Sequence, residues 1–473
     1  MDIDAKSHQK ECDEFMEEMR VLSTTAILGY GFPEESFREG VRRKPHVIAV
    51  DAGSTDPGPY YLGAGVSFTS RSGVKRDLEY MFEAAMDLGV PLIVGTCGGS
   101  GAKAHLDWNV DIVKEISREK GYTFKMAVID ADIPKDVVLQ KLHDGKISPL
   151  HPAPDATEND ISESSNIVGQ MGHEPFLKAL EMGAQVILSG RAYDPVVFAA
   201  LAISRGYDTG LALHMGKILE CAALACTPGS GSDCLFGYLG ADYFRLEPLS
   251  PIRKCTTLSV AAHTLYEKTD PYKLPGPGGM LDLTNTTFEQ TSESAVTVRG
   301  TKFVPTDSYF VKLEGTRRLG YRTVSIAAAT DPIFIEQVDT VVEEVKKRCA
   351  SNFERQNIGE YFLDFKLYGK NGVMSMFSGM PSSTPDELGI VIEAVAQTQD
   401  AANTICSFAR SAMLHYGYPG RKSTAGNLAF PFSPSDFKVG EAYAFSLYHL
   451  MEVSDPLECF PITFTTLSKG ESV

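Results

Sequence analysis

The chain has 473 residues, of which 43% are hydrophobic and 22% are charged, and its formal net charge at pH 7 is −17. This length exceeds that of one ordinary core and predicts two domains. The composition is that of a globular protein, and the sequence has no apolar run long enough to cross a bilayer. The negative charge, with no basic stripe to offset it, argues against nucleic acid and membranes as partners.

The N-terminal twenty residues are charged throughout and lack the apolar stretch of a signal peptide. The nine cysteines are scattered, without a Cys-x-x-Cys pair or the spacing of a zinc finger. Both features fit a reducing compartment. We therefore expect a cytoplasmic protein, and we expect it to form a homo-oligomer.

Between residues 45 and 207, apolar runs of strand type alternate with helical patterns, which is typical of a parallel sheet covered on both faces. The expected strands are residues 46–50, 91–94, 124–129 and 185–188. The expected helices are residues 75–88, 104–119, 135–142 and 195–204. This alternation predicts an α/β domain with a doubly wound, mostly parallel sheet.

The rest of the chain has a different pattern. Segments 295–300, 309–313 and 322–327 alternate apolar and polar residues, which predicts antiparallel strands with one face in water. Helices near residues 335–350 and 398–415 are expected to cover the other face. We therefore predict an α/β domain over residues 1–226, an irregular connection or lid over 227–256, and an α+β domain over 257–473.

Each of the four strands of the α/β domain ends in a polar or glycine-rich turn. These turns are residues 51–56, 95–101, 130–132 and 189–194. In open α/β sheets, ligands bind at the carboxyl ends of the strands. This edge of the sheet is therefore the predicted site.

The loop of residues 95–101 (GTCGGSG) lies between a strand and a helix, where free backbone amides and the helix dipole favour an anion. Residues 99–104 (GSGAKA), which overlap the end of this loop, match the loose G-x-G-x-x-A dinucleotide pattern but lack the Walker A spacing. The alternative is a tight turn that only packs the helix on the sheet. The residues expected to contact a ligand are Thr96, Gly98, Gly99, Ser100 and Gly101.

Cys97 belongs to the same loop, where the start of a helix is expected to lower the pKa of a thiol and favour the thiolate. It is a candidate nucleophile, and the alternative is a small buried residue.

The turn at residues 51–59 (DAGSTDPGP) combines two carboxylates with two hydroxyl groups and a restrained backbone. Asp51, Ser54, Thr55 and Asp56 could bind a divalent cation such as Mg²⁺ or the hydroxyls of a substrate, with Asp51 or Asp56 as the base. The alternative is a turn whose side chains bond to nearby amides. The sequence leaves open whether the protein needs a metal or no cofactor.

Arg191 is the candidate partner for the carboxylate or phosphate of a small anionic substrate, although an ion pair to Asp51 or Asp130 would give it a structural role. Asp194 is expected to cap the following helix and is a candidate catalytic carboxylate. Tyr193 is expected to form a wall of the pocket. Glu220 lies in an apolar stretch and is a candidate general acid or base, the alternative being a salt bridge between the domains.

Several of these segments resemble the acyclic terpene utilisation AtuA family. They are residues 169–175 (GQMGHEP), 183–195 (GAQVILSGRAYDP), 219–221 (LEC), 257–271 (TLSVAAHTLYEKTDP), 415–421 (HYGYPGR) and 432–434 (FSP). The resemblance covers the chain from about residue 20 onwards. It implies a role in the breakdown of branched or unusual carboxylic acids, often as acyl-CoA derivatives, and work with a small companion protein. The loops at residues 51–59 and 95–101 depart from the terpene-utilising type, which argues against an isoprenoid substrate.

From the residues and the resemblance together, we predict a catabolic lyase (a hydratase or dehydratase) or isomerase. Its substrate would be a small hydroxy- or unsaturated carboxylic acid or the CoA thioester of one. Asp51, Asp194 or Glu220 would move the proton next to the carbonyl group. Two alternatives stay open: a nucleotide- or CoA-dependent enzyme that uses the loop of residues 95–101, and a non-catalytic subunit that acts with a small companion protein.

Overall fold

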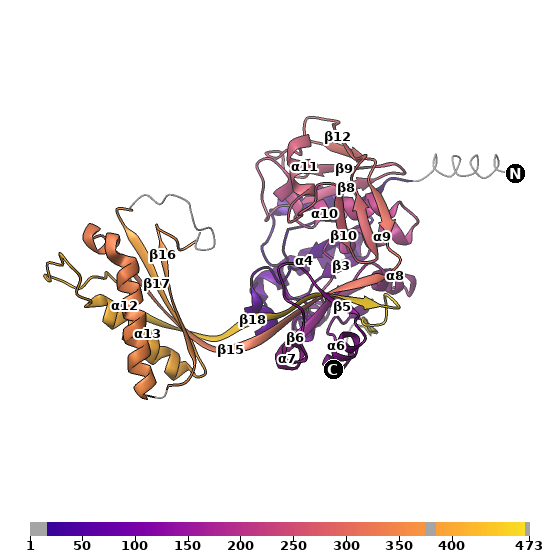
Figure 1. Ribbon diagram of the computed structural model, residues 1–473. Coiled ribbons are helices and arrows are strands. Elements are labelled where there is room, and N and C mark those ends of the chain that lie inside the picture. Colours follow the sequence, from indigo (N-terminus) through magenta and orange to yellow (C-terminus); the bar gives the residue numbers. More distant parts are fainter. Residues whose placement is uncertain (1–16, 357, 374–384, 469–473) are drawn as a thin grey trace. The chain divides into compact units, whose positions relative to one another are not determined.

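The computed structural model describes residues 17–356, 358–373 and 385–468. The chain divides into two compact units. The first contains the residues up to Thr316 together with those from Phe445 onwards, and the second runs from Arg317 to Ala444. Two long strands, β15 (Tyr309–Ala329) and β18 (Asp436–Val453), run through both units (Figure 1).

Among the described residues, the largest sheet has ten strands in the order β12-β13-β9-β8-β1-β2-β3-β7-β4-β19. Its central part, β1-β2-β3-β7-β4, is parallel, and the strands that flank it are antiparallel. The parallel strands are β1 (Met19–Ser23), β2 (Val47–Asp51), β3 (Leu92–Gly95), β7 (Val186–Ser189) and β4 (Phe124–Ile129). The antiparallel strands are β8 (Leu235–Leu239), β9 (Tyr243–Pro248), β13 (Val296–Arg299), β12 (Thr287–Gln290) and β19 (Ile462–Leu467). The predicted α/β class is confirmed.

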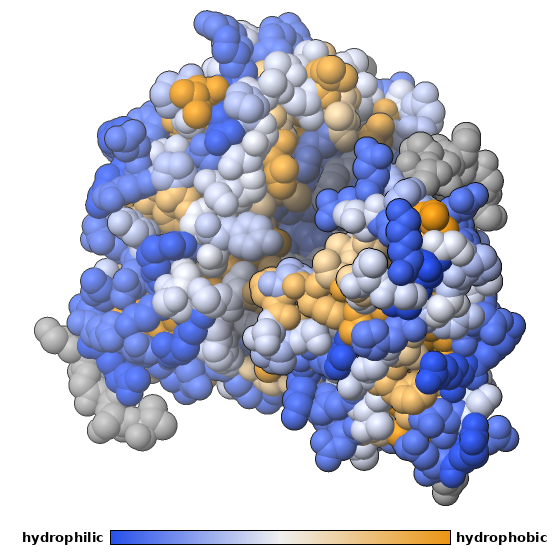
Figure 2. Space-filling view, turned by 90° about the vertical axis from the view of Figure 1, so that its left-hand side faces the viewer, coloured by the Kyte–Doolittle hydropathy of each residue, from blue (hydrophilic) through white to orange (hydrophobic). Residues whose placement is uncertain are grey.

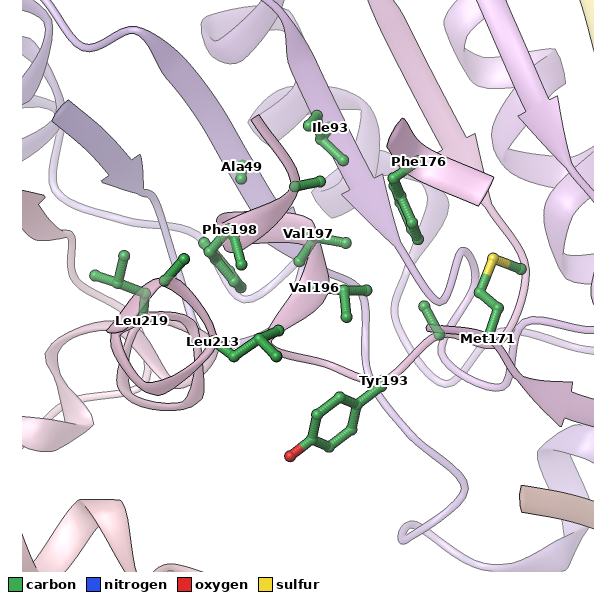
Figure 3. Packing of buried hydrophobic residues seen from close by; sticks show 14 of the residues in the cluster. Ala49, Ile93, Met171, Phe176, Tyr193, Val196, Val197, Phe198, Leu213 and Leu219 are labelled. Atoms are coloured by element: carbon green, nitrogen blue, oxygen red, sulfur yellow. The ribbon is translucent and has the colours of Figure 1, made fainter. Parts of the chain in front are cut away.

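Helices cover both faces of this sheet, because its parallel strands are apolar on both sides. One hydrophobic core includes residues of α4 (Arg71–Leu88) and α5 (Lys103–Lys120), and another includes residues of α9 (Val196–Ser204) and α10 (Thr209–Leu219). In Figure 3, Val197 and Phe198 of α9 pack beside Ala49 and Ile93 of the sheet. The remaining helices of the first unit are α2 (Glu34–Arg42), α3 (Pro59–Ala64), α6 (Lys135–His143), α7 (Glu158–Glu163), α8 (Glu174–Glu181), the 3-10 helix η1 (Ala222–Ala225) and α11 (Thr257–Thr264).

Residues 227–256, predicted to be irregular, contain two strands of the main sheet. Strand β8 pairs with β1 and also with β9. The prediction of an irregular segment is wrong because glycine-rich turns flank and separate these short strands and mask their apolar pattern. The whole of this segment, which was expected to connect two domains, lies inside the first unit.

Two smaller sheets complete the described fold. One is the three-stranded sheet of β10 (Lys273–Gly276), β11 (Gly279–Asp282) and β14 (Lys302–Pro305). The other joins β16 (Tyr361–Tyr368), β17 (Leu388–Ala396), β15, β18 and β5 (Ile147–Pro149), with β6 (Ser164–Gln170) paired to β15. In the second unit, α12 (Pro332–Gln356) and α13 (Gln399–Leu414) share a core with β16 and β17 (Figure 1). Of the predicted antiparallel strands, residues 322–327 lie there in β15, which pairs with β17, and the two predicted helices are present. Residues 309–313 belong to the first-unit part of β15, and residues 295–300 contain β13 of the ten-stranded sheet, so this part of the prediction is wrong.

The surface reflects the charged composition. On the face drawn in Figure 2, hydrophilic side chains predominate, and hydrophobic ones gather in separate patches among them. Within the described residues, no helix is both long enough and apolar enough to cross a membrane.

The loop of residues 95–101 is packed inside the first unit. All seven of its residues are buried. A Cβ added at Gly101 would lie 2.2 Å from the backbone nitrogen of Arg191, and one added at Gly99 would lie 2.2 Å from the ring of Phe68. The glycines therefore allow close packing between this loop, the loop after β7 and Phe68.

This packing predicts the effect of Gly101→Ala. Gly101 has a φ of +69°, so an alanine there combines a left-handed backbone with a backbone clash. We expect the free energy of unfolding to fall by about 2–5 kcal/mol, measured by chemical denaturation. The matched control is Gly145→Ala, which has the same φ of +69° but no atom within 4 Å of the added Cβ. We expect it to cost only about 1–2 kcal/mol. Equal losses in the two variants would contradict the packing argument.

Candidate functional site

A cavity of about 300 Å³ opens at the carboxyl edge of the parallel strands, and all its lining residues belong to the first unit. Its walls come from the loops after β1, β2 and β7, from the end of α10 and from the segment after α11. The acidic side chains that line it are Asp51, Asp56, Asp194, Glu220 and Glu267. The predicted edge of the sheet therefore holds a cavity rich in carboxyl groups.

A larger hollow of about 720 Å³ lies beside α8 and the end of α9. None of the strand-end loops predicted as a site contributes to its lining, and its charged residues Glu174, Lys178 and Glu181 belong to α8. We therefore take the strand-end cavity as the candidate site.

Asp51 is the last residue of β2 and lines this cavity. One carboxyl oxygen, Oδ2, accepts a hydrogen bond from the amide of Gly53 (3.1 Å), while Oδ1 has no partner among the described residues. Room for Oδ1 exists because the neighbouring strand carries Gly95, where a Cβ would lie 3.1 Å from it. Burial, together with the charges of Asp194 and Glu220, holds the pKa of Asp51 well above its ordinary value.

Glu220 follows α10 directly and is also buried. Its Oε1 accepts a hydrogen bond from the ammonium of Lys217, and its Oε2 has no partner within the part of the chain that the structure describes. Burial raises the pKa of Glu220 to about 7, although Lys217 opposes this shift. The predicted salt bridge between domains is wrong, because the partner of Glu220 is Lys217, three residues earlier in the last turn of α10.

Arg191 does not line the cavity. It is buried in ion pairs, with its Nε 2.7 Å from Oε2 of Glu314 and its Nη1 2.8 Å from Oδ1 of Asp194. Glu314, on β15, also accepts hydrogen bonds from Thr55 (2.9 Å) and Lys312 (2.8 Å). The structural alternative predicted for Arg191, an ion pair, is therefore found. Its partners are Glu314 and Asp194, and not Asp51 or Asp130.

The ion pair also explains the position of Asp194. The prediction that Asp194 caps the next helix is wrong, because Pro195 is the N-cap residue of α9 and no side chain caps that helix. Arg191 instead holds one oxygen of Asp194, and the half-buried side chain reaches the cavity. Tyr193 is buried and does not line the cavity, so the prediction that it forms a wall of the pocket is wrong. Figure 3 shows its hydroxyl pointing away from the packed aliphatic side chains around it.

The loop of residues 95–101 does not line the cavity either. The amides of Thr96, Cys97, Gly99 and Gly101 donate to the carbonyl groups of Gly190, Ser189, Thr96 and Cys97. These four amides are already bonded within the protein, and the neighbouring Gly98 and Ser100 are buried with them.

Cys97 lies within this packed loop. The expectation that the helix start lowers its pKa is wrong, because complete burial raises the pKa of the thiol and outweighs any effect of α5. The structure thus gives Cys97 the environment of the small buried residue that was the alternative.

The turn after β2 is closed by local hydrogen bonds. Ser54 donates to Asp56 Oδ2 (2.7 Å), and the amide of Asp56 donates to Ser54 (3.1 Å). The hydroxyl of Thr55 is taken up by Glu314. No group of three or more His, Cys, Asp or Glu side chains in the described ranges is arranged to hold a metal ion.

Sequence reasoning missed Glu314, Lys217 and Lys268. Lys217 had a detectable signal, because a lysine three residues before a glutamate in an apolar helix is positioned to pair with it. Lys268 lies two residues after Tyr266, which lines the cavity, and is half-buried. Glu314 alternates with apolar residues in a strand, a pattern that is usual for a solvent-facing side chain, so nothing marked it as buried.

Chemically, Asp51 and Glu220 both line the cavity, and each has one buried carboxyl oxygen without a partner among the described residues. The charge of Glu220 acts on Asp51, so the two groups lie within electrostatic reach of each other. Such a pair is suited to taking a proton from a bound molecule and giving one back.

The ion pair at Glu314 makes a stability prediction. Although burial opposes it, the charges of Arg191 and Lys312 lower the pKa of Glu314 to about 2, from an ordinary value of 4.5. Glu314→Gln leaves Arg191 buried without its carboxylate, and we expect a loss of about 3–5 kcal/mol near pH 7 in urea denaturation. A lowered pKa stabilises the fold above about pH 4.5, so the difference from wild type should shrink as the pH falls towards 2.

The control for Glu314→Gln is Asp242→Asn, which breaks an ion pair with Arg299 whose side chains are 77% and 44% exposed. We expect it to cost less than about 1 kcal/mol. An equal and pH-independent loss in both variants would contradict the proposed importance of Glu314.

Comparison with known proteins gives a family but no close relative. No curated protein and no solved structure matches the chain at a significant level. The model of the acyclic terpene utilisation family protein AtuA matches residues 72–232 and 253–433, which is most of the chain. The matched ranges include Arg191, Asp194, Lys217, Glu220 and Lys268, whereas Asp51 and its turn lie before them. The resemblance noted in the sequence is thereby confirmed, and the chain belongs to the acyclic terpene utilisation AtuA family.

Proposed function

We propose that the protein is a catabolic enzyme, a lyase or isomerase, that acts on a small hydroxy- or unsaturated carboxylic acid. The observation that carries this proposal is that Asp51 and Glu220, each with one carboxyl oxygen that has no partner among the described residues, line the same cavity. The family, described by its part in acyclic terpene utilisation, supports a catabolic role. A cavity of about 300 Å³ suits a small molecule.

Glu220 is the proposed base. Its pKa of about 7, raised by burial, leaves a substantial fraction of the carboxylate charged at neutral pH and makes it a stronger base than an exposed glutamate. Lys217 holds Oε1, so Oε2, which has no partner among the described residues, is the oxygen proposed to take a proton from the carbon next to the carbonyl group.

Asp51 is the proposed acid. Because burial holds its pKa well above the ordinary value, it keeps a proton at a pH at which an exposed aspartate is charged. In a dehydration, Glu220 takes the proton from the α-carbon, the electron pair forms the double bond, and the β-hydroxyl leaves as water with the proton of Asp51. Hydration is the reverse reaction. In an isomerisation, the protonated carboxyl group returns the proton to a different carbon.

The alternatives find less support. A nucleotide-dependent enzyme would need the loop of residues 95–101 to meet a ligand, and that loop is buried with four amides bonded internally. A requirement for a divalent cation, and action as a subunit beside a small companion protein, stay predictions. Neither is favoured by a specific contact.

Deuterium exchange tests the two roles for any substrate of the proposed class. The purified protein is incubated in D₂O with a panel of hydroxy- and unsaturated acids and their CoA thioesters, and exchange at the α-carbon is followed by NMR. We expect Glu220→Gln to slow exchange by about 10²–10⁴-fold, because it removes the base. We expect Asp51→Asn to keep exchange but lose net dehydration, because only the departure of the hydroxyl group needs the acid.

The control for these variants is Glu289→Gln, a carboxylate-to-amide change at an exposed position of β12. It should leave both rates unchanged. Wild-type exchange in Glu220→Gln, or no exchange in the wild type with any compound, would refute the assignment.

The pH dependence provides a separate check. A base must be deprotonated to act, so the exchange rate should rise from about pH 6 to pH 8 and level off, with an apparent pKa near 7. Residual exchange in Glu220→Gln should lack this rise. A rise that persists in this variant would assign the base to another group.

A further inference from the structure

Lys268 is a cation near the cavity that has no acidic partner. No carboxylate lies within 4.0 Å of its ammonium in the described residues, whereas Arg191, Lys217 and Lys312 are each held in an ion pair. The ammonium of Lys268 lies 5.6 Å from the centre of the Tyr193 ring. The ring of Tyr193 thus stabilises the positive charge of Lys268 from one side, but it accepts none of the hydrogen bonds that the ammonium can donate.

The position of Lys268 places its charge close to the proposed chemistry. The preceding residues Tyr266 and Glu267 line the cavity. Lys268 is not itself a lining residue, but the charges of Glu220 and Asp194, which line the cavity, act on it, as do those of Lys217 and Lys312. A half-buried ammonium without a carboxylate partner is stabilised by a bound anion, since the protein does not supply one.

The exposed residues around the cavity have the opposite charge. Asp56 and Glu267 are exposed lining residues, and no Lys, Arg or His occurs among the described residues of the lining. Coenzyme A carries several phosphate charges and would have to lie against these carboxylates when its acyl group entered the cavity. A single small carboxylate can pass the acidic residues and reach Lys268 with a much smaller repulsion.

Resting on the proposed function, we infer that the substrate is a free carboxylic acid rather than a CoA thioester, and that Lys268 binds its carboxylate. This role was expected of Arg191 and of the loop of residues 95–101, which are both engaged in internal bonds. The α-carbon is bonded directly to this carboxylate, and the charge of Glu220, the proposed base, acts on Lys268. Lys268 also faces the negative charge that develops on the carboxylate when the α-proton leaves.

Binding measurements test this inference separately from turnover. Isothermal titration and thermal shift are recorded with a panel of four- to eight-carbon hydroxy- and enoic acids that includes 3-hydroxybutyrate and crotonate, with crotonamide as the uncharged match, and with coenzyme A. We expect at least one acid to bind, its amide to bind at least tenfold more weakly, and coenzyme A not to bind. Lys268→Met should weaken acid binding at least tenfold, and Lys268→Arg should restore part of it.

Two further variants separate the possible causes of failure. Lys273→Met removes an exposed lysine that lies 3.5 Å from Asp282 and should bind acids like the wild type. Glu220→Gln should still bind acids, because it removes the base and not the proposed carboxylate site. Acid binding without any exchange in the wild type would reject the proposed reaction and keep the binding site. Binding of coenzyme A, equal binding of acid and amide, unchanged binding in Lys268→Met, or no binding of any acid would overturn the inference.

Discussion

The buried ion pair between Arg191 and Glu314 joins the segments that surround the candidate site. Glu314 comes from β15, Arg191 from the loop after β7 and Thr55 from the loop after β2, so three segments far apart in sequence meet at one carboxylate. A buried charge is costly unless each of its bonding positions is satisfied, and here both oxygens of Glu314 accept hydrogen bonds. This requirement fixes the loops relative to one another, and it fixes Asp194 through the second ion pair of Arg191.

Around this fixed centre, the loops at the carboxyl edge divide into two kinds. The loop of residues 95–101 and the backbone of residues 189–191 pack against each other and supply no lining to the cavity. The loops that carry Asp51 and Asp194 do line it, together with Glu220 at the end of α10. The two kinds of loop meet at Gly95, which has no Cβ and therefore leaves room beside Oδ1 of Asp51.

The distribution of charge in the cavity follows from this arrangement. Burial raises the pKa of both Asp51 and Glu220, because water no longer stabilises their charged forms. Of the nearby cations, Lys217 pairs with Glu220 itself, Arg191 pairs with Glu314 and Asp194, and Lys268 rests against an aromatic ring. The family match includes Glu220, Lys217 and Lys268 but begins after Asp51, so the proposed base lies inside the matched range and the proposed acid lies outside it.

The sequence by itself determined the parallel sheet and the edge at which the cavity lies. Strand β4 has the predicted bounds, and strands β2, β3 and β7 are each shifted by one residue, because apolar runs that end in glycine or aspartate are a strong local signal. It also pointed to Asp51, Asp194 and Glu220. Only the tertiary structure decided that β8 and β9 belong to the same sheet and that Arg191 forms an ion pair with Glu314. It also decided that Lys268 forms no ion pair with a carboxylate among the described residues. Each of these depends on pairing between distant segments, for which a single sequence holds no periodic or local signal.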